Sequence, residues 1–204
     1  MVSIINQNAI TSPHHNDTIH VALSIWDLAD EYNRHAAVTI LSLLEHCDKR
    51  RHIAVHLLYD AILSAQNQDE TVKNMNRYRE LISGYNAELI FNHIDADYLF
   101  SEIPASKIFT VGALYRLFLP ELLLDIERVL YLDCDMVVNV DISELYDIDM
   151  EDYPLAAVAE GTVDSTWMSY YKLVGIIPEI YFNSGLLLLN LHKIRDTVDL
   201  VGGA

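Results

Sequence analysis

The chain alternates between short apolar segments and segments with helical periodicity, and this alternation restricts its fold more than any other feature. We expect strands at residues 19–25, 52–59 and 87–94, separated by helices at residues 34–47 and 69–85. A helix between two strands returns the chain to the edge of the sheet from which it started, which favours parallel pairing. The sequence therefore predicts an α/β fold, a mainly parallel sheet flanked by helices on both faces.

The second half of the chain continues the pattern. The expected elements are a helical segment at 110–124 that ends near Pro120, a strand from 128, a helical turn at 141–148, a strand at 154–160, a helix near 165–174 and a buried strand at 184–191. There is no internal repeat or linker, so one domain is the simplest interpretation. We expect residues 1–18 to form a flexible leader and residues 19–204 to form that domain.

The composition excludes two broad classes of protein. The 204 residues are 51% hydrophobic with a mean hydropathy of +0.15, which is enough for a sizeable core and excludes a disordered chain. The net charge of −17 and only 13 Lys and Arg argue against nucleic acid as a partner. The acidity is concentrated late, because residues 121–204 hold 16 Asp and Glu against 4 Lys and Arg. A bound metal ion would relieve this repulsion.

The cysteines and the apolar runs bear on the cellular compartment. Cys47 and Cys134 have neither a disulfide framework nor zinc-ligand spacing, which is typical of a reducing environment. No apolar run approaches the ~18 residues of a membrane span, and the first residues do not have the pattern of a signal peptide. We expect a cytoplasmic protein without a transmembrane segment. The sequence gives no support for peripheral contact with a membrane.

The segment RVLYLDCDMVVNVD, residues 128–141, contains two acids one position apart after an apolar run. In an extended strand, Asp133 and Asp135 would point to one face and Cys134 to the other. Buried parallel strands bind ligands beyond their carboxyl ends, so the pair has a functional position. The seven glycines form neither GxGxxG nor GxxxxGK[ST], the usual phosphate-binding motifs. A bound diphosphate would therefore need a hard cation, Mg²⁺ or Mn²⁺, held by the two carboxylates.

Three segments together resemble glycosyltransferase family 8, the retaining nucleotide-sugar transferases with the GT-A fold. They are ALYRLFLPELL, then VLYLDCDMVVNVDISELYDIDMEDYPLAAVAE, and YFNSGLLLLNL. The similarity extends from about Ile19 to Arg195. The Asp-x-Asp motif alone is common, whereas its order and spacing with Tyr-Arg-Leu and Phe-Asn-Ser-Gly are specific.

The resemblance assigns roles to individual residues. It implies that Asp133 and Asp135 bind the metal, with Asp133 also facing the donor ribose. It implies that Arg116 contacts the diphosphate and the sugar, a role suited to its fixed fork of donors. Asn183 and Glu160 would line the sugar pocket, although the family often has Asp at the position of Glu160.

The loop that follows the first strand corresponds to the uridine-binding turn of the family. In the segment SIWDLADEYNRH, residues 24–35, either Asp27 or Asp30 would meet the uracil, and Tyr32 would stack on it. The sequence does not choose between the two acids.

The resemblance implies a metal-dependent transfer of a hexose from a UDP-sugar to a hydroxyl acceptor, a saccharide or a lipid-linked saccharide, with retention at the anomeric carbon. The family continues beyond its LLLLNL strand into segments that supply further sugar, metal and phosphate contacts, and we expect residues 19–204 to lack them. Two alternatives stay open. One is a weak or inactive nucleotide-sugar-binding fragment. The other is a phosphatase of the haloacid dehalogenase type, in which Asp133 would be the nucleophile.

Overall fold

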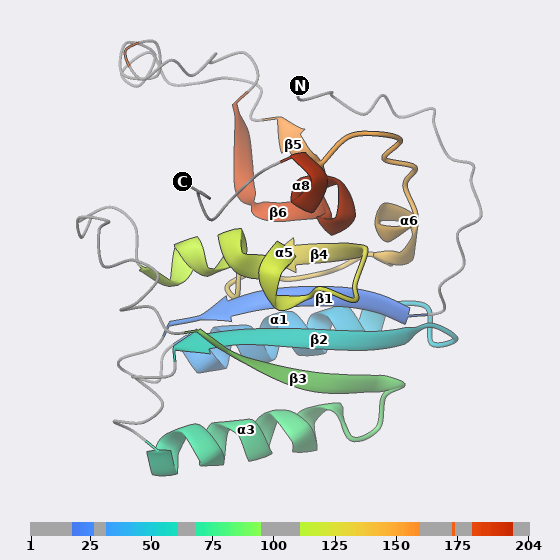
Figure 1. The fold of residues 1–204 in the computed structure, drawn as a ribbon. Helices are drawn as coiled ribbons and strands as arrows, with labels where there is room; N and C mark the ends of the chain where they lie inside the picture. The colour runs from blue at the N-terminus through green and yellow to red at the C-terminus, as the bar shows by residue number, and fades with distance from the viewer. Residues whose placement is uncertain are drawn as a thin grey trace.

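The computed structural model describes residues 18–26, 32–60, 68–94, 111–159, 173 and 181–197. Within them, six strands form one sheet (Figure 1), and these are β1 (Thr18–Ile25), β2 (His52–Asp60), β3 (Ala87–Ile94), β4 (Arg128–Leu132), β5 (Leu155–Ala159) and β6 (Phe182–Asn190). The helical elements are α1 (Tyr32–His46), α3 (Gln68–Ile82), the 3₁₀ helix η1 (Val111–Phe118), α5 (Leu119–Leu122), α6 (Ser143–Tyr146) and α8 (Leu191–Thr197).

The strand order β3-β2-β1-β4-β6-β5 explains where a ligand would bind. Strands β1 to β4 are parallel, whereas β6 is antiparallel to both β4 and β5. The expected α/β fold with a mainly parallel sheet is confirmed. From β1 the sheet grows through β2 and β3 in one direction and through β4 in the other. Such a reversal leaves a crevice at the carboxyl ends of the two central strands, here β1 and β4.

Helices cover both faces of the sheet, as Figure 1 shows for α1 on one side and for η1 and α5 on the other. Alternate residues of β1 enter two separate cores. Leu23 belongs to a core with Ile40 of α1, whereas Ala22 belongs to a second core with Tyr115 of η1 and Leu119 of α5. One face of β1 therefore packs against α1, and the other face packs against η1 and α5.

The helical segment around Pro120 differs from its prediction. It begins as the 3₁₀ helix η1, and Pro120 lies in the first turn of α5 instead of ending the helix. A proline is tolerated there because the first N–H groups of a helix have no intrahelical acceptor. The helix α8 was not predicted from the sequence. Its first turn is capped by the Asn190 side chain, whose Oδ1 accepts a hydrogen bond from the backbone N of Lys193 at 3.0 Å.

The strand that precedes the acidic pair is shorter than expected. β4 ends at Leu132, and residues 134–135 form a turn one residue after it. The premise that the chain continues as an extended strand through Asp133 and Asp135 is therefore wrong. The physical reason is that the backbone around Cys134 and Met136 bonds to a side chain of α1 instead of to a neighbouring strand. Cys134 and Cys47 are both buried.

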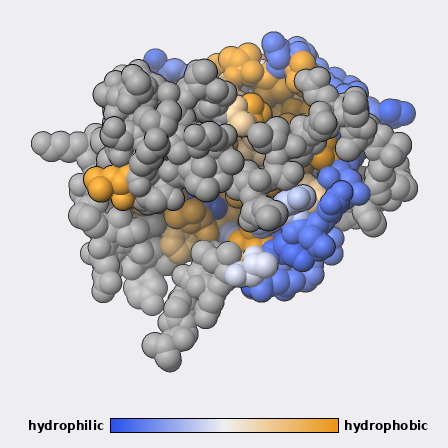
Figure 2. Space-filling model, turned by 90° about the horizontal axis from the view of Figure 1, so that it is seen from above, coloured by the Kyte–Doolittle hydropathy of each residue, from blue (hydrophilic) through white to orange (hydrophobic). Residues whose placement is uncertain are grey.

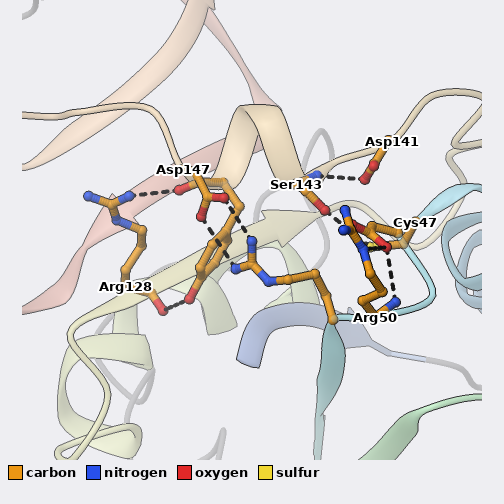
Figure 3. A network of polar contacts seen from close by, with 9 residues as sticks. Cys47, Arg50, Arg128, Asp141, Ser143 and Asp147 are labelled. Carbon is orange, nitrogen blue, oxygen red and sulfur yellow. Dashed lines mark hydrogen bonds and ion pairs between the residues drawn. The ribbon is translucent and has the colours of Figure 1, made fainter. Parts of the chain in front are cut away.

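A polar network lies at the amino ends of β2 and β4, at the other end of these strands from the acidic pair (Figure 3). Arg51 forms an ion pair with Asp147 just after α6, with 2.7 Å between Nη1 and Oδ2. Arg128 and Tyr146 bond twice, because the Arg128 guanidinium donates to the Tyr146 carbonyl at 2.7 Å and the Tyr146 hydroxyl donates to the Arg128 carbonyl at 2.9 Å. This network fixes the α6 segment far from the carboxyl ends of the strands.

Seen from above, over β5, β6 and α8, the described residues present hydrophobic and hydrophilic areas side by side (Figure 2). Val158 of the edge strand β5 is 66% exposed. None of the helices in the described part of the chain combines the length and the apolar character that a membrane crossing requires.

Candidate active site

A pocket lies at the carboxyl ends of β1 and β4, where the strand order predicts a crevice. Its lining comes from the end of β1, the start of α1, the 3₁₀ helix η1, and β4 with its following turn. The residues are Ser24, Trp26, Tyr32, Gly112, Ala113, Arg116, Tyr131, Asp133, Cys134 and Asp135. The part that these residues line holds about 160 Å³. Ligand pockets usually hold about 300–1,000 Å³, so a whole nucleotide sugar would extend beyond these residues.

Asp133 is fixed on several sides. Its Oδ1 accepts hydrogen bonds from Nη2 of Arg116 at 3.1 Å and from the hydroxyl of Tyr131 at 3.0 Å. Its backbone N donates to the carbonyl of Gly185 at 2.8 Å. A Cβ atom at position 185 would lie 2.7 Å from Oδ2, so the carboxylate needs glycine at this point of β6. The carboxylate is therefore oriented before any ligand arrives.

Arg116 is held as firmly as its acidic partner, and its side chain is only 11% exposed. Its Nε donates to the carbonyl of Ala113 at 2.7 Å, and its Nη1 donates to the carbonyl of Ser184. The guanidinium also lies over the ring of Tyr131, 4.3 Å from the centroid, which adds a cation–π interaction. A guanidinium has five N–H donors, so two remain beyond these three contacts with described residues. They can bind an anion in the pocket.

Tyr131 supports both members of this pair. Burial raises its pKa well above the ordinary value of 10, so the hydroxyl stays protonated. The hydroxyl lies 3.0 Å from Oδ1 of Asp133 and 3.3 Å from Oγ of Ser24. Its single proton goes to the carboxylate, because a hydrogen bond to a charged acceptor is the stronger one. Tyr131 can then accept the proton of Ser24.

Asp135 differs from Asp133 in having no fixed partner. Its side chain is exposed, lines the pocket and makes no hydrogen bond or ion pair with the residues that the structure describes. The carboxylates of Asp133 and Asp135 together fit Mg²⁺ or Mn²⁺. Such ions are usually held by one or two carboxylates together with substrate phosphates and water. No group of three or more possible protein ligands exists within the described ranges. A diphosphate and water would therefore supply the other ligands.

Asn183 of β6 is exposed and reaches the site through Gly185. Its Oδ1 accepts a hydrogen bond from the backbone N of Gly185 at 2.7 Å, and it would lie 3.0 Å from a Cβ at that position. The residue thus shapes the start of β6, where the Gly185 carbonyl accepts from the backbone N of Asp133. This local structural role is the one that an asparagine before Ser-Gly commonly has.

The other predicted site residues divide into two groups. Tyr32 lines the pocket at the start of α1 and is 42% exposed, so its ring is accessible to a ligand. Asp27, Asp30 and Glu160 lie outside the described residues.

Sequence reasoning missed several residues that line the pocket, among them Tyr131, Trp26 and Gly112. Tyr131 precedes Asp133 by two positions, and this spacing could have placed it on the same face. Trp26 and Gly112 form a close contact, because a Cβ at position 112 would lie 2.4 Å from the Cβ of Trp26. The contact between Trp26 and Gly112 is visible only in the packing of η1 against the end of β1.

Comparisons with known proteins show the family and the fold of the chain. The sequence model of glycosyl transferase family 8 matches residues 24–198. General stress protein A of Bacillus subtilis is 29% identical over 169 residues, which are 81% of this chain and 54% of that protein. Lipopolysaccharide 1,3-galactosyltransferase of Salmonella typhimurium is 29% identical over 159 residues, which are 76% of this chain and 44% of that protein. The chain spans about half the length of these curated relatives.

Solved structures share the fold. Galactosyltransferase LgtC, crystallised with donor and acceptor sugar analogs, is similar with a TM-score of 0.72 and 25% identity over 88% of this chain and 60% of that chain. The bifunctional glycosyltransferase WbbM is similar with a TM-score of 0.69 and 22% identity over 91% of this chain and 34% of that chain. The six-stranded sheet with its flanking helices is the GT-A fold. With the family model matched over most of its length, the chain belongs to glycosyltransferase family 8.

Proposed function

We propose that this chain carries the donor site of a retaining glycosyltransferase, which moves a hexose from a UDP-sugar to a hydroxyl acceptor with the aid of a divalent metal. One observation carries the proposal. Asp133, Asp135 and Arg116 line a single pocket at the carboxyl ends of the two central strands. Two carboxylates for a cation and a guanidinium for an anion are the charges that a metal diphosphate requires.

The residues of the pocket divide the work of donor binding. Asp135, which has no partner among the described residues, would be the closer metal ligand, and Asp133 would add its Oδ2 while Oδ1 stays with Arg116 and Tyr131. A bound Mn²⁺ or Mg²⁺ would supply positive charge that stabilises the departing UDP. Arg116 would bind the diphosphate with the N–H groups that the described contacts leave over. Its rigid position costs little ordering on binding.

The nucleoside and the sugar would lie on either side of this centre. Tyr32 presents an accessible ring at the start of α1, which suits stacking on uracil, and Asp27 or Asp30 would bind the base. Asn183 and Glu160 would contact the sugar. A similar lipopolysaccharide 1,3-galactosyltransferase in Salmonella typhimurium supports a saccharide or lipid-linked saccharide as acceptor.

For the transfer itself, we infer a same-face mechanism. Retention by double displacement would require a carboxylate nucleophile at the anomeric carbon. In the described part of the pocket, Asp133 and Asp135 are the only carboxylates, and both are assigned to the metal. The leaving phosphate would then accept the proton of the acceptor hydroxyl, while Arg116 stabilises the charge that develops on it. The comparisons give no support to the phosphatase alternative.

Calorimetric titration of UDP into the chain tests this proposal, in the presence of Mn²⁺, in the presence of EDTA, and with Asp135→Asn. We expect binding that requires Mn²⁺ and is lost in the variant, because one of the two protein ligands is then neutral. Equal binding with Mn²⁺ and EDTA, or full affinity of Asp135→Asn, would overturn the proposed metal site. Phosphate release from simple phosphomonoesters, abolished by Asp133→Asn, would instead favour the phosphatase.

A further inference from the structure

The turn that carries Asp135 is bound from behind by a threonine of α1. Thr39 is fully buried, and its Oγ1 lies 2.8 Å from the carbonyl oxygen of Cys134 and 2.7 Å from that of Met136. The backbone N of Met136 donates to the same oxygen at 3.1 Å. The side chain of Thr39 is thus in contact with the peptide groups on both sides of Asp135.

These contacts restrain the backbone of Asp135 specifically. The carbonyl of Cys134 belongs to the peptide before Asp135, and the N–H of Met136 belongs to the peptide after it. Because both bind one hydroxyl, the two torsion angles of Asp135 between them have little freedom. The hydroxyl has one proton, which goes to one carbonyl at a time among those of Cys134, Met136 and His35, the last at 3.2 Å. Its lone pair can accept from the backbone N of Met136 throughout.

Ser42, one turn further along α1, extends the same support. Its Oγ accepts from the backbone N of Val138 at 3.0 Å and donates to the carbonyl of Thr39 at 3.0 Å. Two hydroxyls of one helix therefore bind residues 134–138, from the side of the sheet opposite to η1. In contrast, the Asp135 carboxylate has no partner among the described residues. Its position depends on the backbone alone.

We propose that Thr39, assisted by Ser42, is a positioning residue for the metal ligand Asp135. This inference rests on the proposed function. Neither residue touches the donor, and both act by fixing the direction in which the Asp135 side chain leaves the turn. A ligand held by an ordered backbone loses less freedom when the metal binds, and groups that orient metal ligands typically contribute about 10-fold to 100-fold in affinity.

The test compares Thr39→Val with Thr39→Ser. Valine has nearly the shape of threonine but leaves the N–H of Met136 and the carbonyl of Cys134 without their partner, whereas serine keeps the hydroxyl. The measurements are Mn²⁺ affinity in the presence of UDP, from the electron paramagnetic resonance signal of free Mn²⁺, and stability from urea unfolding. We expect Thr39→Val to bind Mn²⁺ at least about tenfold more weakly and Thr39→Ser to stay within about threefold of the wild type.

Tyr146→Phe is the matched control, because it removes a hydroxyl that donates to the Arg128 carbonyl at the other end of the strands, away from the pocket. It should lower stability and leave Mn²⁺ affinity unchanged, which separates positioning from a general loss of stability. If Thr39→Val does not fold, Ser42→Ala replaces it, with an expected loss of about threefold.

The outcomes distinguish the inference from the proposed function. A wild-type chain without metal-dependent UDP binding would overturn the proposed function and this inference with it. A wild-type chain with such binding, together with unchanged Mn²⁺ affinity in Thr39→Val, or in Ser42→Ala if that variant is needed, would overturn only the role of the α1 hydroxyls. Equal losses in Thr39→Val and Tyr146→Phe would do the same, because they would reflect stability.

Discussion

Nη2 of Arg116 lies 3.1 Å from Oδ1 of Asp133, and this ion pair joins η1 to the end of β4. The pair explains why Asp133 and Asp135 can lie so close in sequence. The fixed positive charge of Arg116 offsets the repulsion between the two carboxylates. A diphosphate entering the pocket would therefore find the Arg116 guanidinium already paired with Asp133. The anion would share Arg116 with Asp133, and a cation would compensate the carboxylate for that loss.

Replacing Arg116 with lysine should weaken UDP binding in the presence of Mn²⁺ by about tenfold. Lysine keeps the charge, but it cannot reproduce the fork that bonds Asp133, Ala113 and Ser184 and still faces the pocket. Calorimetry measures the change. Arg195→Lys is the control, because Arg195 also donates to backbone carbonyls, those of residues 120, 123 and 126, but lies outside the pocket lining. Equal affinity of Arg116→Lys and the wild type would contradict the assignment.

The close approach of β6 to the acidic turn predicts a large effect of one methyl group. In Gly185→Ala, the new Cβ would lie 2.7 Å from Oδ2 of Asp133, so the carboxylate must move. We expect Mn²⁺–UDP binding at least about tenfold weaker. Gly84→Ala is the matched control, because no atom lies within 4 Å of a Cβ at that position. The prediction fails if the two variants bind equally well.

The stability of the fold should depend on pH through a histidine pair on β1 and β2, of which His56 is buried. Nδ1 of His20 lies 3.1 Å from Nε2 of His56, and His56 is 2% exposed. Burial, with a smaller contribution from His20, lowers the pKa of His56 from 6.5 to about 4. Burial also lowers the pKa of His20, partly offset by Glu88 and reinforced by His52.

The sign of this dependence follows from proton binding. Below pH 6.5 the unfolded chain protonates His56, whereas the folded chain does so only near pH 4. Stability is therefore present above pH 6.5 and is lost as the pH falls toward 4, by roughly 2 kcal/mol between pH 7 and pH 5. Urea unfolding at the two pH values should show a smaller loss in His56→Gln than in the wild type. The exposed His192→Gln should behave as the wild type, and an unchanged loss in His56→Gln would refute the prediction.

The ion pair between Arg51 and Asp147, near the amino end of β2, should affect stability without affecting the proposed donor site. Arg51 is 11% exposed, so Asp147→Asn removes a charged partner from a largely buried guanidinium. We expect a loss of about 1 kcal/mol in the free energy of unfolding, from urea titration, and unchanged UDP binding. Asp48→Asn should have no measurable effect, because its partner Arg50 is 89% exposed. A change in UDP affinity for Asp147→Asn would show that this ion pair and the proposed donor site are coupled.

The sequence predicted the elements of the sheet better than the irregular segments between them. The strands β1, β2, β3 and β6 begin and end within two residues of their expected ranges, because buried strands and amphipathic helices leave clear periodic patterns. The extended geometry expected at Asp133 and Asp135 was wrong, since the chain leaves the sheet at Leu132 and its backbone contacts Thr39 of α1. A hydrogen bond between residues 95 positions apart has no local signal.

By itself, the sequence determined that the fold is α/β, that Asp133 and Asp135 follow a central strand, and that Arg116 and Asn183 occur in family segments. These conclusions depend on local patterns and on order along the chain. Only the tertiary structure decided that Arg116, Tyr131 and Gly185 all surround one carboxylate and that Thr39 supports the other. The physical reason is that these contacts arise from strand order, which places β4 between β1 and β6, and from the packing of helices on both faces of that sheet.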